Sequence, residues 1–172
     1  DMSVLPLLME AKEKAAETME PQRIIPALSA LLEYEWISGQ HYLQQEELDH
    51  ALRLSEERGN IYEYSRYAFW LWKARKQKAD LKAVYEGYQI SNPASTAKAA
   101  ALWEKLGCAY EQALLLFEGT EEDKKRALNI TDALGATSVH EKMKMQMRAS
   151  GIKRIPRGMR KSTRSNTVFL TE

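Results

Sequence analysis

The sequence contains few of the residues and runs that mark secreted, low-complexity or membrane-spanning chains. A lone cysteine, Cys108, cannot form an internal disulfide, which indicates a reducing compartment. Five prolines and eight glycines in 172 residues argue against a low-complexity chain. No apolar run approaches the roughly 20 residues of a membrane-spanning helix, and no signal peptide is visible at the start. These absences predict a soluble, cytoplasmic protein with no membrane partner.

Charge of one sign is also scarce overall, but the two parts of the chain differ. The formal net charge is +1. Residues 151–172 hold six Lys and Arg against one Glu, a balance of +5, which leaves 19 basic and 23 acidic residues in 1–150, a balance of −4. A hydrophobic fraction of 44% is enough to build a core. We therefore expect one helical domain over 1–150, followed by a basic, flexible linker over 151–172.

Apolar residues recur with a helical period through most of residues 1–150. No convincing strand pattern is present, and short Gly or Asn turns separate the helical segments. The sequence predicts an all-α fold of stacked antiparallel hairpins, a tetratricopeptide-like right-handed superhelix of about eight or nine helices. The expected helices cover residues 3–19, 21–38, 41–58, an aromatic stretch after Asn60, 80–90, 94–106, 108–118, 120–134 and 138–150.

Local signals refine two of these helices. Asn60 with Glu63, and Ser138 with Glu141, have the spacing of capping boxes at helix starts. The helix after Asn60 is aromatic almost all round, so we expect it at the middle of the stack, with its rings in the core. Three methionines alternate in the last helix (Met143, Met145 and Met147), so at least one of them is expected to be exposed.

A repeat motif lies in the second half of the chain. Trp103, Leu106, Gly107 and Tyr110 have the spacing W-x2-L-G-x2-Y, the first half of the tetratricopeptide pattern. In such a repeat the ring and the leucine pack one helix on the next, and the glycine lets two backbones approach. The second half of the pattern is not matched. The alternative is that all four are ordinary core residues of a helical bundle.

The sequence has no motif that carries catalysis or binds a cofactor. The sequence lacks a phosphate-binding G-x-x-x-x-G-K-[ST] loop and the G-x-G-x-x-G and G-x-S-x-G patterns. His140-Glu141 begins like a zinc site, but Lys144 occupies the second ligand position. Cys108 leaves open an enzyme that uses a thiol, although a small buried hydrophobe is favoured. We expect no enzyme activity, metal or cofactor in this chain.

The basic segment is the one electrostatic signal. Its cations could contact nucleic-acid phosphates with salt-sensitive affinity, or they could belong to a solvated spacer. The segment has no aromatic residues among these cations for base stacking. The candidates for phosphate contacts are Lys153, Arg154, Arg157, Arg160, Lys161 and Arg164.

Three segments together resemble the C-terminal part of large bacterial LuxR-type transcriptional regulators. They are YAFWLWKA, the stretch AALWEKLGCAYEQALLLFEG with RALNITDALGA, and GIKRIPRGMRKSTRSNTVFLTE. The family signature W-x2-L-G-C-x-Y-E-x-A-L-x-L is matched from Trp103 to Leu116, except that Ala109 stands where the family often has Pro. The linker pattern G-[VI]-x-x-[IV]-P-R-G-x-R-x-[ST]-T-R-x-N is matched from Gly151 to Asn166.

This resemblance implies a fragment of a longer regulator. Members of the family carry an AAA-type ATP-binding domain before the helical repeats and a LuxR-type helix-turn-helix after them. ATP and sequence-specific DNA binding would then belong to those missing domains. The helical region would bind a protein, a peptide or a small inducer on its concave face and so regulate transcription. The alternative is a stand-alone scaffold or adaptor, and the oligomeric state stays open between a monomer and a homodimer.

Overall fold

The computed structural model describes residues 4–58, 60–79 and 84–156. Within these residues the chain forms eight α-helices and one short 3₁₀ helix, with no β-strand. The prediction of an all-α fold with eight or nine helices is confirmed. The elements are α1 (Val4–Thr18), α2 (Pro21–Ser38), α3 (Gln45–Arg58), α4 (Ile61–Arg75), η1 (Glu86–Tyr88), α5 (Pro93–Lys105), α6 (Ala109–Leu116), α7 (Glu121–Ala133) and α8 (Thr137–Ala149).

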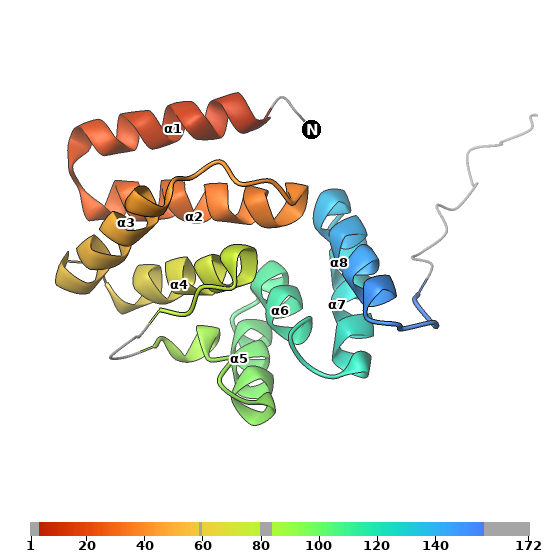
Figure 1. Ribbon diagram of the computed structural model, residues 1–172. Coiled ribbons are helices and arrows are strands. Elements are labelled where there is room, and N and C mark those ends of the chain that lie inside the picture. Colours follow the sequence, from red (N-terminus) through yellow and green to blue (C-terminus); the bar gives the residue numbers. More distant parts are fainter. Residues whose placement is uncertain (1–3, 59, 80–83, 157–172) are drawn as a thin grey trace, which may run out of the picture.

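Helix α2 is the centre of the N-terminal half. It packs against α1 on one side and α4 on another, and it also contacts α3 and α8. Figure 1 shows α1, α2 and α4 in successive layers, whereas α5, α7 and α8 run roughly across that direction. The pairs α1–α2, α5–α6 and α7–α8 are consecutive helices in contact, and the C-terminal half continues the stack from α4 through η1, α5 and α6 to α8.

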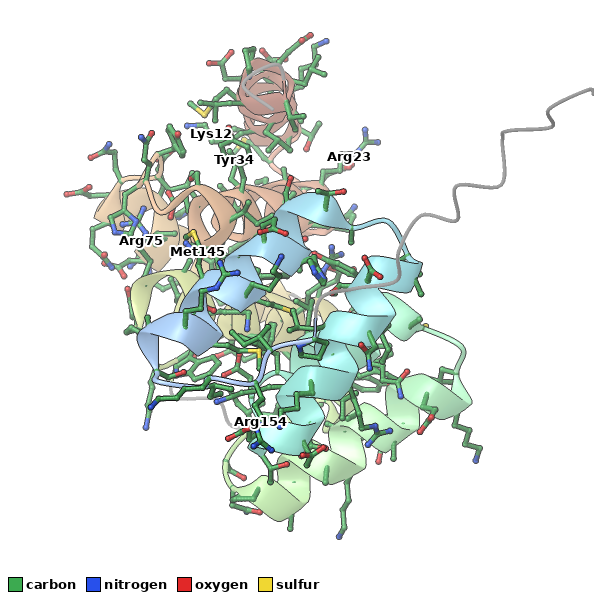
Figure 2. All side chains as sticks on the ribbon, turned by 90° about the vertical axis from the view of Figure 1, so that its right-hand side faces the viewer. Lys12, Arg23, Tyr34, Arg75, Met145 and Arg154 are labelled. Atoms are coloured by element: carbon green, nitrogen blue, oxygen red, sulfur yellow. The ribbon has the colours of Figure 1, made fainter. Side chains whose placement is uncertain are left out.

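The aromatic helix α4 lies in the core, as its sequence predicts. Its Tyr67, Phe69 and Trp70 are almost fully buried. The Trp70 ring lies 6.0 Å from that of Trp36 on α2, measured between ring centroids. The methionine prediction is confirmed as well, because Met143 and Met147 are fully buried while Met145 is 56% exposed (Figure 2).

Helix α3 begins four residues later than the sequence suggests. The backbone N–H groups of Tyr42 and Leu43 donate to the carboxylate of Glu35, at 2.5 and 2.8 Å. Those donors hold the chain against α2 before the helix begins at Gln45. Apolar periodicity carries no information about such a contact, because Glu35 lies on a different helix.

Two local predictions are wrong. The expected helix over 80–90 is replaced by the single 3₁₀ turn η1, with residues 80–83 outside the described part. Tyr85 and Tyr88 are three residues apart, a spacing that also suits a 3₁₀ turn. The expected capping box of Ser138 and Glu141 is absent too: α8 begins at Thr137, and its N-cap residue is Ala136. Asn60 does cap α4 by accepting a hydrogen bond from the Glu63 N–H.

Candidate functional site

Trp103 is the packing residue that the repeat motif predicts, and it belongs to an aromatic cluster. Its ring centroid lies 5.4 Å from that of Tyr88 and 5.9 Å from that of Tyr85. Its indole Nε1–H donates to the Gly87 carbonyl at 2.6 Å. The cluster joins η1 to α4 and α5, because Tyr62 of α4 lies 6.3 Å from the same ring. Trp103 therefore holds the irregular turn in place between two helices.

Two parts of the motif behave differently from the expectation. The Leu106 side chain is 52% exposed, because the buried stripe of α5 ends at Trp103. Gly107 does not mark a close approach, since a Cβ there would meet nothing within 4 Å. The packing roles predicted for these two residues are wrong. Gly107 instead adopts a left-handed φ of +72°, and the bonds Cys108 N–H to Trp103 O and Gly107 N–H to Glu104 O form a Schellman ending.

Tyr110 connects distant helices through a polar contact rather than through ring packing alone. Its hydroxyl on α6 donates to the Glu33 carboxylate on α2. Burial raises the pKa of Glu33, although the bond from Tyr110 opposes that shift. Burial likewise raises the pKa of Tyr110. Tyr110, the tyrosine of the repeat motif, thus links the two halves of the chain.

A second buried carboxylate, Glu35, is bound on several sides. Arg75 at the end of α4 donates to it from Nε at 2.6 Å and from Nη2 at 2.7 Å. The same Nη2 also donates to the Leu43 carbonyl at 2.8 Å. Burial alone would raise the pKa of Glu35, but the hydrogen bonds from Arg75 and from Leu43 and Tyr42 outweigh it and leave the pKa below its usual value. This network ties α2, α4 and the 40–44 loop together.

The structure describes only the first part of the basic segment. Lys153 and Arg154 are exposed, and Figure 2 shows Arg154 on the stretch after α8. Ile152 and Ile155 pack against the core. Arg157, Arg160, Lys161 and Arg164 lie outside the described residues. Gly151 ends α8 with a φ of +82°, and the Ile152 N–H donates to the Met147 carbonyl at 3.1 Å, so the segment starts against the body.

The residues weighed for catalysis do not come together. Cys108 is partly buried against the core, with its Sγ 3.8 Å from the Leu106 carbonyl oxygen. His140 is buried on α8, where its Nδ1 lies 3.1 Å from Thr131 Oγ1 and 3.2 Å from the Leu128 carbonyl oxygen. His41 lies at the surface beside Glu35. Within the described ranges, no three His, Cys, Asp or Glu side chains are grouped so that they could hold a metal ion.

A basic pocket lies where the two halves of the stack meet, and no sequence motif indicates it. It has a volume of about 190 Å³ and draws side chains from α2, α4, α7 and α8 and from the end of α6. Its lining residues are Trp36, Lys73, Lys76, Phe117, Glu118, Lys124, Gln146, Met147 and Ser150.

Lys73 is the buried cation at the base of this pocket. It is only 3% exposed, and its Nζ donates to the Glu118 carboxylate. The same Nζ lies 4.6 Å from the ring centroid of Trp36 and 5.4 Å from that of Phe117. Burial lowers the pKa of Lys73, the neighbouring lysines lower it further, and Glu118 opposes both effects. A lysine at such a position is held by one carboxylate and by ring faces.

The other two lysines of the pocket lie against rings as well. Lys76 Nζ is 5.1 Å from the Trp72 ring centroid, and Lys124 Nζ is 6.0 Å from that of Phe117. In the part of the chain that the structure describes, neither ammonium has a carboxylate oxygen within 4.0 Å. The signal for this site was present in the sequence as Lys73, Lys76 and Lys124, but nothing in the spacing brings 124 next to 73.

The comparisons with known proteins do not assign a family. No family model matches the chain, and neither the curated proteins nor the solved structures contain a significant match. No helix in the described part of the chain combines the length and the apolar character needed to cross a membrane.

Proposed function

We propose that this chain is the regulatory helical-repeat region of a cytoplasmic bacterial LuxR-type transcriptional regulator. In this proposal, a protein, peptide or small inducer binds the stacked helices. That binding alters DNA recognition by a helix-turn-helix that would follow residue 172. The ATP-binding domain of such a regulator would precede residue 1. The chain itself acts as a binding and coupling region and carries no reaction.

The observation that carries the proposal is the attachment of the basic segment to the helical body. Ile152 and Ile155, which occupy apolar positions of the family linker pattern, pack against the core directly after α8. A linker that begins in contact with the body can respond to a change in α8, whereas a free spacer cannot. Helix α8 in turn contacts α2 and α7, so its position depends on both halves of the stack.

The free energy needed to couple ligand binding to DNA binding is modest. Coupling between two sites typically amounts to about 1–3 kcal/mol. A ligand that binds one arrangement of α8 more tightly by that amount would change DNA affinity about five- to 150-fold. Repacking of two half-buried isoleucines lies in the same range, at roughly 1 kcal/mol each.

The first test uses the reading frame beyond residue 172 and the protein that it encodes. A helix-turn-helix there supports the regulator, and a stop codon supports the stand-alone adaptor. In the full-length protein, operator binding should change when residues 1–150 are deleted. Operator affinity and inducer response that are both indifferent to the deletion would contradict the proposal.

The second test concerns the basic segment. Replacing Arg157, Arg160 and Arg164 with Gln should flatten the dependence of log K on log salt by up to about three units, if each contacts one phosphate. The measurement is operator binding by the full-length protein at several salt concentrations. The matched control replaces the exposed Arg53, Lys98 and Lys105 with Gln. Equal slopes in the two triple variants would reject the phosphate role.

A further inference from the structure

The charges that line the basic pocket do not balance. Three lysines face one carboxylate, and Glu118 is already bonded to Lys73. Lys76 and Lys124 have ring faces as neighbours, and each such contact is worth only about 0.5–1 kcal/mol when exposed to water. Two ammonium groups therefore remain to receive an anion at the mouth of the site, beside a third that is buried.

We infer that the basic pocket binds a small organic anion, with a phosphate or carboxylate group between Lys76 and Lys124 and a short apolar body against Trp36 and Phe117. This deepens the proposed function by naming a ligand class. It rests on that proposal only for the regulatory consequence, because binding itself needs nothing beyond this chain.

The size and walls of the pocket limit the ligand. A volume of about 190 Å³ is smaller than that of a typical pocket for a drug-sized ligand, about 300–1,000 Å³, and it suits an anion the size of a small phosphate ester or an aryl carboxylate. Trp36, Phe117 and Met147 supply the apolar wall, while Gln146 and Ser150 add polar groups on α8. Most of the lining residues are polar or charged and three are apolar, so a small ligand that joins an anionic group to a short apolar part suits the site.

The position of the pocket explains how occupancy would reach the linker. Lys76 caps the end of α4, and Lys124 lies in the first turns of α7. An anion between them joins two helices that belong to different halves of the stack. Ser150, which also lines the pocket, directly precedes Gly151, where the basic segment begins. Binding would therefore restrain the last turn of α8.

The experiment titrates phenyl phosphate and, separately, benzoate into the full 172-residue chain at low salt. Binding is followed by calorimetry and by tryptophan fluorescence, since Trp36 lines the site. We expect saturable one-to-one binding of at least one of these probes and none of phenol, which lacks the charge. The comparison of the two anions distinguishes a phosphate site from a carboxylate site.

Variants test the location. Lys76→Gln and Lys124→Gln each remove one ammonium group and leave the Lys73–Glu118 pair intact. Each should weaken binding about tenfold, which corresponds to about 1.4 kcal/mol. Lys124→Arg, which keeps the charge, should retain most of the affinity. The controls Lys98→Gln and Lys105→Gln, both exposed on α5, should bind like the parent chain, and unchanged thermal unfolding shows that each variant folds.

Two results would overturn the inference. One is no saturable binding of either anion by the parent chain. The other is equal weakening by the pocket and control substitutions, which would indicate only general electrostatic attraction. A third result would contradict the proposed function but not the anion site. If the pocket variants lose binding but the full-length protein binds its operator equally well with and without the anion, the site stands and the regulatory role fails.

Discussion

Two glycines near Trp103 show how differently one residue type can act. A Cβ on Gly87 would lie 2.8 Å from atoms of the Trp103 ring and 2.8 Å from the Tyr85 ring. Gly107 has open space around it but a φ of +72°. The close approach that the repeat motif assigns to Gly107 therefore occurs at Gly87, which no motif marks. Only the folded chain places Gly87 under the indole.

Substitution should separate these two roles. We expect Gly87→Ala to lower the free energy of unfolding by about 1–3 kcal/mol through overpacking against the rings. Gly107→Ala should cost about 1–2 kcal/mol, because an alanine in a left-handed conformation is strained. A second change, Trp103→Phe, should relieve part of the Gly87→Ala penalty and none of the Gly107→Ala penalty. Urea unfolding of the three single variants and the two double variants measures these energies, and relief of both penalties alike would contradict the assignment.

Glu35 should make stability depend on pH. Its pKa is lowered in the folded chain, since the bonds from Arg75 and two backbone N–H groups outweigh burial. The charged form therefore stabilises the fold above the ordinary carboxyl range, and this contribution disappears as pH falls through the lowered pKa. Glu35→Gln should cost about 3–5 kcal/mol at pH 7, the usual result of breaking a buried pair.

The check is urea unfolding of both proteins from pH 7 down to pH 3. The difference in unfolding free energy between parent and Glu35→Gln should shrink toward acid pH. Glu13→Gln, at an exposed position of α1, is the control and should follow the parent at every pH. A constant difference across the range would show that the Glu35 charge is not what stabilises the network.

At the scale of elements, the same local capping pattern marks the true start of one helix and not of another. Thr120 caps α7 through a reciprocal pair of bonds: its Oγ1 accepts from the Asp123 N–H at 3.2 Å, and Asp123 Oδ2 accepts from the Thr120 N–H at 3.1 Å. Ser138 has an equally suggestive spacing but falls inside the first turn of α8. The difference is set by the Schellman ending of α7, in which the Ala136 N–H donates to the Thr131 carbonyl and the Gly135 N–H to the Asp132 carbonyl. This ending places Ala136 directly before α8.

These two residues form a matched pair for mutation. Thr120→Ala should destabilise the chain by about 1 kcal/mol through loss of the cap. Ser138→Ala should change stability by less than about 0.5 kcal/mol, as is usual for surface substitutions away from special features. Thermal unfolding of both variants provides the measurement. A larger loss of stability for Ser138→Ala than for Thr120→Ala would contradict the assigned N-caps of α7 and α8.

At the scale of the whole molecule, the basic segment is less separate from the helical domain than its composition predicts. The expected boundary after residue 150 coincides with the end of α8, but the segment continues along the body through Ile152 and Ile155. Charge composition predicts a linker here because it takes no account of the two apolar side chains that pack on the body. The two isoleucines show that this segment starts as part of the packed structure.

Truncating these isoleucines should reveal that attachment. Ile152→Ala with Ile155→Ala should lower the free energy of unfolding by about 1–2 kcal/mol, because both side chains are half-buried. Leu7→Ala is the control, since Leu7 is 65% exposed on α1, and it should change stability by less than about 0.5 kcal/mol. Hydrogen exchange of the α8 amides should also become faster in the double variant. An unchanged exchange rate would mean that the segment does not restrain α8.

Sequence alone determined the helical class, most helix bounds, the central place of the aromatic helix and the exposure of one methionine. These properties follow from apolar period, turn residues and ring content, all of which act over a few neighbouring residues. Tertiary structure decided the rest: the 3₁₀ turn beneath Trp103, the carboxylate of Glu35 bound by Arg75, and the meeting of Lys73, Lys76 and Lys124 in one pocket. Those features depend on which helices lie side by side, and no pattern within a single segment encodes the distance between residues that are far apart in the chain.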